Sequence, residues 1–167
     1  MVLRRIICKR MKTQPTTIQP DDLSDPRVRA LLDEHLQQMA SQSPPESVHA
    51  LDCAGLKKPG VKFFAAKTAS GEPAGIAALK ILDSNSAEVK SMTTADNFRR
   101  TGVASELLQH LINEARLLEV ATLYLETGSM PEFAAARALY CKFGFTYCKP
   151  FSTYTEDPYS VFMSLTI

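Results

Sequence analysis

The pattern of apolar and polar residues along the chain predicts three principal helices. These helices are expected over residues 26–40, 102–118 and 132–143. In the first two, apolar side chains recur at helical spacing, so each helix would bury one face. Ser24 or Asp25 is suited to cap the first helix, with Pro26 in its first turn. Gly144 would end the third helix as its C-terminal cap.

The same pattern predicts seven strands. They are expected at Thr16–Gln19, Val61–Thr68, Ala74–Leu82, Ala87–Thr94, Ala121–Thr127, Phe145–Lys149 and Ser160–Ile167. The fourth strand has no clean apolar face, which indicates that one of its faces lines a polar site. The fifth has apolar residues in near-continuous supply and is predicted to be buried on both faces. Strands on either side of the two late helices predict an α/β fold with a mixed sheet flanked by helices.

Composition narrows the classes of function. The 167 residues are 45% hydrophobic and 22% charged, with a formal net charge of +1. That length predicts one domain, residues 16–167, after an N-terminal extension of residues 1–15. The near-neutral charge and the lack of a run of ~20 apolar residues predict no nucleic-acid and no membrane partner. The four cysteines lack zinc spacing, so we expect no metal, free and packed thiols, and a cytoplasmic protein.

The stretch Ala87–Leu118 reads as a strand, a basic turn with one glycine and a long amphipathic helix. Such a turn presents free backbone N–H groups at the positive end of the helix dipole, which favours an anion. Arg99 and Arg100 stand at the mouth of the turn and suit a phosphate. A dinucleotide fold would need G-x-G-x-x-G and a Walker loop would need Gly-Lys-Ser/Thr, and both are absent.

Two motifs together resemble a known family. Arg99–Ala104 has the form R-x-x-G-x-A, and Ala136–Phe145 has the form A-x-x-LY-x-x-x-GF. In this order, from about Val61 to the C-terminus, the sequence resembles the GNAT superfamily of N-acetyltransferases. The first motif is similar to its coenzyme-A signature. The segments SPPESVHALD, EVKSM, LETGS and DPYSVFM resemble its small, YsnE-like bacterial subgroup. The resemblance implies the GNAT fold, a mostly antiparallel sheet with splayed central strands, and acetyl-CoA as cosubstrate.

The resemblance also implies which residues bind the cosubstrate. In this family a bulge splits the strand before the signature and exposes main-chain groups. The main chain of Met92, Thr93 and Thr94 would therefore bind the acetyl carbonyl and the pantetheine arm. The N–H groups that would hold the pyrophosphate belong to Arg99, Arg100, Thr101, Gly102, Val103 and Ala104. The small side chains of Gly102 and Ala104 would let phosphate approach the backbone.

Catalytic roles follow from the same resemblance. Tyr140 occupies the position of the family's general acid, which protonates the departing thiolate, although it would otherwise be an aromatic residue packed on the sheet. The candidates for the base that deprotonates the amine are, in order of preference, Glu88 and Glu126, then Glu46 and His49. Each carboxylate would alternatively be a structural group. Cys141 suggests a covalent acyl-enzyme, which we disfavour because neighbouring helical residues point ~100° apart.

The acceptor is expected to be the primary amine of a small molecule. The segment Ser43–Asp52 and the loop Phe151–Ser160 would enclose a pocket, with four tentative substrate-binding residues: Glu46, Ser47, His49 and Lys90. Lys90 would bind an acidic substrate or pair with a carboxylate. Two other functions remain open, a non-catalytic acyl-CoA sensor and a protein or peptide N-acetyltransferase. A homodimer is possible, and His35 and His110 are expected on helix surfaces.

Overall fold

A seven-stranded sheet forms the middle layer of the computed structural model, which describes residues 14–167. The strands are β1 (Thr16–Pro20), β2 (Val61–Thr68), β3 (Pro73–Ile81), β4 (Ser86–Thr94), β5 (Thr122–Gly128), β6 (Thr146–Cys148) and β7 (Ser160–Thr166). Their spatial order is β1-β2-β3-β4-β5-β7-β6. All neighbours are antiparallel except β4 and β5. The predicted mixed, mostly antiparallel α/β fold is confirmed.

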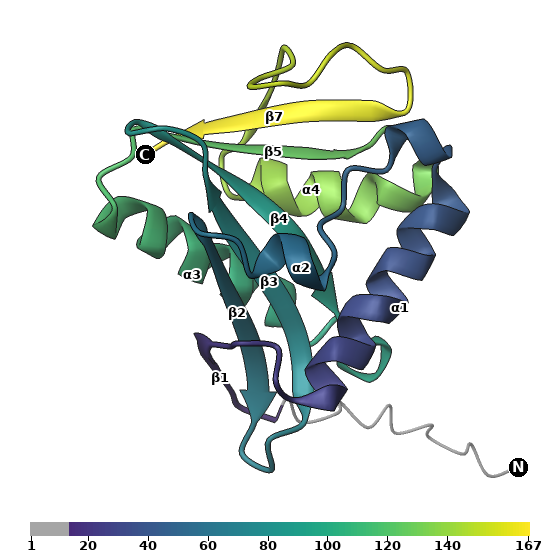
Figure 1. Ribbon diagram of the computed structural model, residues 1–167, viewed down its shortest axis with the longest axis vertical. Helices are drawn as coiled ribbons and strands as arrows, with labels where there is room; N and C mark the ends of the chain where they lie inside the picture. The colour runs from purple at the N-terminus through teal and green to yellow at the C-terminus, as the bar shows by residue number, and fades with distance from the viewer. Residues whose placement is uncertain (1–13) are drawn as a thin grey trace, which may run out of the picture.

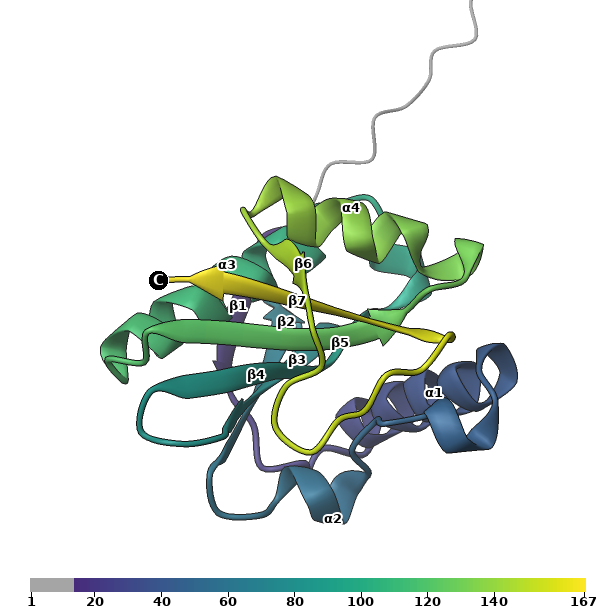
Figure 2. The same ribbon diagram turned by 90° about the horizontal axis from the view of Figure 1, so that it is seen from above.

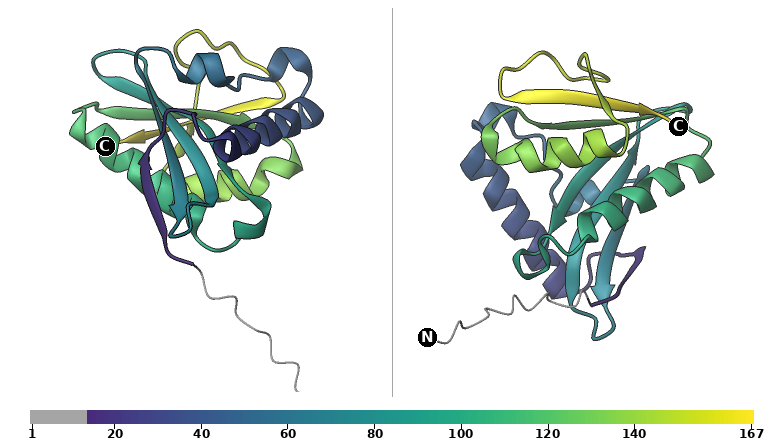
Figure 3. Two further views of the ribbon diagram at one scale, coloured as in Figure 1. Left: turned by 60° about the horizontal axis from the view of Figure 1, so that its bottom comes forward. Right: turned by 180° about the vertical axis from the view of Figure 1, so that it is seen from behind.

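Helices cover both faces of the sheet. They are α1 (Pro26–Gln42), α2 (Cys53–Leu56), α3 (Val103–Leu117) and α4 (Ala134–Lys142), with single 3-10 turns at Pro45–Ser47, Asp96–Phe98 and Pro131–Phe133. α1 and α2 lie on one face, and α3 and α4 lie on the other (Figure 2). Figure 3 shows α3 and α4 from behind, crossing the strands. Each pair buries its own apolar cluster against the sheet, so the sheet separates two cores.

Close packing of α3 on the sheet depends on a glycine. A Cβ atom at Gly75 of β3 would come within 2.9 Å of side-chain atoms of Leu107 and Val103. Real Cβ atoms do not tolerate that distance, so any larger residue would push α3 outward. Because interiors are packed as densely as organic crystals, such a shift would open voids elsewhere in the core. Gly75 therefore sets the distance between the sheet and the start of α3.

The centre of the sheet splits between β4 and β5. The two strands pair in parallel only over Ser86–Val89 and Thr122–Leu125. Beyond these residues they diverge toward α1 (Figure 1). The register of β4 against β3 also shifts between Ile76 and Ala78, and Ser91 opposite this shift has a left-handed φ of 50°. Such a bulge bends and twists a strand. The bulge and the splay together leave the far half of β4 without a partner on the β5 side among the described residues.

The connection between β6 and β7 passes beneath the sheet on the side of α2 (Figure 2). Phe151 in this loop stacks on Tyr124 of β5, with ring centroids 4.6 Å apart. Tyr154 packs against Phe162 of β7 at 5.4 Å. Aromatic contacts of this kind contribute beyond their buried area. The loop therefore covers the part of this face, over β5 and β7, that α1 and α2 do not reach.

Most predicted elements are present, with a few differences. β5 is not buried on both faces. Leu123 and Leu125 are buried, while the alternating residues Thr122, Tyr124 and Glu126 are only half-buried, because a loop rather than a helix covers that side. The described cysteines are free as predicted, but Cys141 is exposed rather than packed. Residues 1–13 of the predicted extension lie outside the described residues. Within residues 14–167, no helix is long and apolar enough to cross a membrane.

Candidate active site

A cleft of about 400 Å³ opens where β4 and β5 diverge. One side of it is formed by α1 and the segment Ser43–Ala50, and the other by the start of α3 and by α4. The gap between the two strands connects the sides, because β4 contributes residues 89–94 and β5 contributes residues 126–128. The cleft thus passes through the sheet, and molecules on opposite faces could meet in it.

On the α3–α4 side, α3 begins without a side-chain cap. Its N-cap residue is Gly102, with φ 101°, and a Cβ there would meet nothing within 4 Å. Among the described residues, the backbone N–H groups of Gly102, Val103 and Ala104 find no acceptor. Free N–H groups at a helix N-terminus, added to the helix dipole, form an anion site. Arg99 and Ala104 line the cleft beside this helix start.

The unpaired half of β4 forms the floor of the cleft. Met92, Thr93 and Thr94 line it, and all three are half-buried. β5 pairs with β4 only as far as Val89, so the β4 main chain beyond the bulge is free to bind a ligand on that edge. An extended segment with a free edge is suited to hydrogen bonds with an amide-containing chain.

Tyr140 of α4 reaches the cleft from the same side. The residue is 6% exposed and lines the cavity. Burial, and to a smaller extent the nearby Glu126 carboxylate, raises the pKa of the Tyr140 phenol well above its ordinary value. The phenol is therefore protonated at neutral pH, and its O–H group is a hydrogen-bond donor.

Glu126 of β5 contributes the carboxylate that faces the cleft. Successive side chains of a strand alternate, and the neighbouring Leu125 packs into the α3–α4 core, so Glu126 approaches from the other face. Its Oε1 atom accepts a hydrogen bond of 2.7 Å from the Ser160 hydroxyl. Burial raises the pKa of Glu126 above its ordinary value, and this hydrogen bond opposes the rise. Such a carboxylate is a stronger base than one in water.

Glu88 of β4 lies in a different environment. It is 1% exposed and is not among the residues that line the cleft. The Tyr154 hydroxyl donates to its Oε1 atom at 2.6 Å, and the Lys90 Nζ atom lies 3.2 Å from the same oxygen. Its other oxygen has no partner among the described residues. This carboxylate is part of a buried network that holds the β6–β7 loop against β4.

Lys90 completes that network. Its Nζ atom donates to the Tyr154 hydroxyl at 2.9 Å and to the main-chain carbonyl of His49 at 2.8 Å. Burial and the neighbouring Glu88 charge raise the pKa of the Tyr154 phenol, so Tyr154 remains a neutral donor. The lysine therefore ties together β4, the loop before β7 and the segment before α2.

Comparison with known proteins identifies the family. The model of the acetyltransferase (GNAT) family matches residues 28–145. The chain belongs to the GNAT acetyltransferase family. It is 49% identical to the uncharacterized N-acetyltransferase YsnE of Bacillus subtilis over 88% of this chain and 97% of YsnE. It is 48% identical to the uncharacterized N-acetyltransferase YedL of Escherichia coli over 90% of this chain and 94% of YedL. The predicted resemblance to the YsnE-like subgroup is confirmed.

A solved structure supports the fold. The crystal structure of a Klebsiella pneumoniae protein described as an acyl-CoA N-acyltransferase superposes with a TM-score of 0.70 and 28% identity. The superposition covers 90% of this chain and 97% of the other. Together with the family match, it confirms that the chain is an acyltransferase with the GNAT fold.

The structure brings together most of the residues predicted for a GNAT site. Ser47, His49 and Lys90 line the cleft, as do Tyr140 and Glu126. Glu46 does not, because its 3-10 turn directs it to the solvent, where it is exposed. Of the predicted signature residues, Arg100, Thr101, Gly102 and Val103 are not on the cleft wall. They form the turn that leads into α3, so it is their main chain that is positioned for a ligand.

Sequence reasoning missed the contribution of α1. Four of its residues line the cleft: His35, Gln38, Met39 and Gln42. His35 is half-buried rather than on the surface, and burial lowers its pKa to about 4. His110 is also half-buried, with its ring packed edge-on against Phe64 at 4.6 Å. These four α1 residues are spaced so that they lie on one helical face. That spacing is the sequence signal that could have indicated a second, polar and partly buried side of the helix.

Proposed function

We propose that this GNAT protein transfers an acetyl group from acetyl-CoA to the primary amine of a small molecule, by direct attack in a ternary complex. One observation carries the proposal. An uncapped helix start, a free strand edge, a buried carboxylate and a buried phenol meet in one cleft that passes through the sheet. Each is a component that acetyl transfer requires.

The residues at the start of α3 fit the pyrophosphate of coenzyme A. The free N–H groups from Gly102 to Ala104 and the uncapped helix end favour a negative group. Arg99 adds a cation that is 55% exposed and held by Asp96 at 2.7 Å. The free edge of β4 beyond Val89 fits the amide groups of the pantetheine arm. Acetyl-CoA would supply the thioester from which the acetyl group is transferred.

Glu126 and Tyr140 are proposed as base and acid. The amine nitrogen forms a bond to the acetyl carbon as the carbon–sulfur bond breaks. The proton lost by the amine passes to the Glu126 carboxylate, directly or through water, and the departing thiolate takes the proton of the Tyr140 hydroxyl. A main-chain N–H group on the β4 edge at Met92–Thr94 would stabilise the oxyanion that forms on the acetyl oxygen.

Glu88, the other predicted base, is proposed to act by positioning. Glu88 is 1% exposed and is bound to Tyr154 and Lys90, so it does not reach the cleft. It stabilises the wall of the cleft and does not take the proton of the amine. Cys141 is exposed and does not line the cleft, which supports direct attack over an acyl-cysteine route.

The dimensions of the cleft favour a small acceptor. About 400 Å³ lies at the lower end of the range for small-molecule sites, and the end of the cosubstrate would share it. A peptide would need a long groove, whereas the segment Ser43–Ala50 and α1 form a wall on this side of the cleft. The small volume of the cleft supports a small amine over a protein tail.

The proposal is tested by coenzyme-A release with a panel of small amines. Tyr140→Phe should lower kcat about a hundredfold or more, because general acid–base groups contribute roughly 10²–10⁴-fold. Glu126→Gln should lower it by a similar factor. Matched controls are Tyr147→Phe, at a side chain that is 59% exposed, and Glu119→Gln, at an exposed residue. Full activity of both site variants would contradict the assigned roles, and acetyl-CoA binding without turnover would favour the sensor function.

A further inference from the structure

The α1 side of the cleft is lined by polar side chains and has no aspartate, glutamate, lysine or arginine among them. Its hydrogen-bonding side chains are His35, Gln38, Gln42, Ser43, Ser47 and His49. Burial lowers the pKa of His35 to about 4, so this imidazole is neutral at physiological pH. Amides, hydroxyls and neutral imidazoles both donate and accept hydrogen bonds. This wall is therefore complementary to uncharged polar groups.

The lysine in the cleft wall has no free donor for a carboxylate. An ammonium group has three N–H donors. Those of Lys90 face the Tyr154 hydroxyl, the His49 carbonyl and the Glu88 carboxylate, at 2.9, 2.8 and 3.2 Å. The side chain is 7% exposed, and its charge is balanced by Glu88. A substrate carboxylate would have to break this network and leave a buried Glu88 charge unpaired, which is costly.

The remaining charges in the cleft favour a cation. Arg99 lies at the α3 end and is paired with Asp96. Glu126 and Glu132 also line the cavity, and neither has an ion-pair partner among the described residues. A cleft lined by unpaired charges of one sign attracts ligands of the opposite sign and repels those of the same sign. An ammonium group would be attracted here, and a carboxylate would be repelled.

We propose that the acceptor is an amine whose other polar groups are uncharged hydroxyl or amide groups, and that the cleft discriminates against amines carrying a carboxylate. This inference rests on the proposed function, since it concerns the acceptor of the same acetyl transfer. The α1 wall binds the hydroxyl or amide groups, while Glu126 faces the amine. The buried Glu88–Lys90–Tyr154 network sets the selectivity, because it occupies the Lys90 ammonium group, which would otherwise bind a substrate carboxylate.

Matched acceptors test the inference with the full-length protein. Serinol is compared with serine, and glycinamide with glycine, with rates expressed per concentration of unprotonated amine. We expect kcat/KM to be about tenfold or more higher for each neutral member, because like-charge contacts oppose the acids. Equal or faster acetylation of the acids would overturn the inference.

A binding measurement separates this inference from the proposed function. If no acceptor of either series were acetylated, the proposed transfer to a small primary amine would be contradicted. Calorimetry on the protein saturated with coenzyme A would still decide the selectivity. Tighter binding of serinol and glycinamide supports it, whereas equal binding of the acids, or no binding of the neutral members, overturns it.

Tyr154→Phe provides the converse test. Removing this hydroxyl frees one donor of Lys90 to bind a carboxylate. We therefore expect the ratio of kcat/KM for the neutral acceptor to that for the acid to fall severalfold, while the circular dichroism spectrum is unchanged. Tyr147→Phe, at an exposed tyrosine, is the control and should keep the full preference. An unchanged preference in folded Tyr154→Phe would show that the network does not set selectivity.

Discussion

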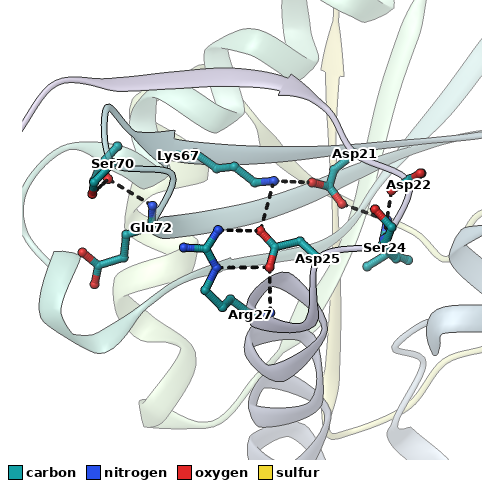
Figure 4. A network of polar contacts seen from close by, with 10 residues as sticks. Asp21, Asp22, Ser24, Asp25, Arg27, Lys67, Ser70 and Glu72 are labelled. Atoms are coloured by element: carbon teal, nitrogen blue, oxygen red, sulfur yellow. Dashed lines mark hydrogen bonds and ion pairs between the residues drawn. The ribbon is translucent and has the colours of Figure 1, made fainter.

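The N-termini of α1 and α3 differ in capping: a side chain caps α1, whereas none caps α3. At α1 the Asp25 carboxylate accepts from the Arg27 backbone N–H at 2.9 Å and also binds the Arg27 guanidinium at 2.9 and 3.1 Å. Lys67 links this group to Asp21, with its Nζ atom 2.7 Å from Asp21 and 3.6 Å from Asp25 (Figure 4). At α3 the N-cap is Gly102, which has no side chain to offer.

The capped start of α1 contributes to stability, whereas the uncapped start of α3 is available for binding. An internal carboxylate accepts from the first N–H group of α1, that of Arg27, and lies at the positive end of the helix dipole. The equivalent groups of α3 find no acceptor among the described residues, and we propose that they bind an external anion. α2 is capped in the manner of α1, since the Asp52 side chain accepts from the Gly55 N–H. α4 also begins without a side-chain cap, but its first N–H group, that of Ala134, donates to the Pro131 carbonyl of the preceding 3-10 turn. Within residues 14–167, the N–H groups at the start of α3 find no such acceptor, and they lie where the cleft opens.

The largest expected effect comes from placing a carboxylate at the open helix start. Ala104→Asp puts a carboxylate in the first turn of α3, where it interacts with the positive end of the helix dipole and repels phosphate. We expect acetyl-CoA affinity to fall about a hundredfold or more, since like-charge juxtaposition costs several kcal/mol, while thermal stability is kept. Calorimetry and thermal unfolding measure the two quantities. Gln109→Glu, which adds the same charge at an exposed position of α3, is the control. Unchanged affinity in Ala104→Asp would refute the anion site.

A smaller effect is expected from the glycine itself. Gly102→Ala meets no atom within 4 Å but forces alanine to adopt φ 101°, which costs roughly 1–2 kcal/mol. Relaxation of the turn should weaken acetyl-CoA binding about tenfold. The matched control is Gly144→Ala, at φ 93°, where the same strain lies at the end of α4. Both variants should lose stability, but only Gly102→Ala should lose affinity. An equal loss of affinity in both would mean that general destabilisation is the cause.

The reverse result is expected at α1. Asp25→Ala removes the cap and the partner of Arg27 and Lys67. We expect the melting temperature to fall by a few degrees with no change in acetyl-CoA affinity, because the N-terminus of α1 does not line the cleft. Differential scanning calorimetry and a binding titration check this. A loss of affinity comparable to that of Ala104→Asp would remove the distinction between the two helix starts.

The smallest expected effect is a pH dependence of stability. Hydrogen bonds from Arg27 lower the pKa of Asp25 from 3.8 to about 2. Since the folded-state pKa is depressed, the contribution is complete above pH 3.8 and is lost as the pH falls toward 2. Asp25→Asn should therefore lose less stability than the wild type on acidification from pH 5 to pH 2, in urea titrations at fixed temperature. Parallel losses in both proteins would contradict the assignment.

Local features of the site were readable from the residues. The Pro26 helix start with its aspartate, the single glycine at position 102 and the strand before it are short-range patterns, and each is present as predicted. They are readable because capping and backbone preferences act within a few residues. The family resemblance added the splayed strands, which Ser86–Thr94 and its neighbour confirm.

The roles of the two carboxylates could not be separated in this way. Glu88 and Glu126 both lie on strands beside the gap, and the sequence ranks them together. Their difference comes from Tyr154, which lies 66 residues from Glu88 in the chain and 2.6 Å from it in space. Burial and hydrogen-bond partners at such separations depend on how the β6–β7 loop folds back under the sheet.

Sequence alone was sufficient for the three principal helices, the strands, the open start of α3 and, through its motifs, the family. Each of these depends on residues that are near neighbours in the chain. Only the folded structure showed that α1 lines the cleft, that Lys90 has its donors occupied and that Glu126 rather than Glu88 faces the cavity. These features require charges and polar groups from distant segments to be desolvated together, and desolvation is a property of the packed fold.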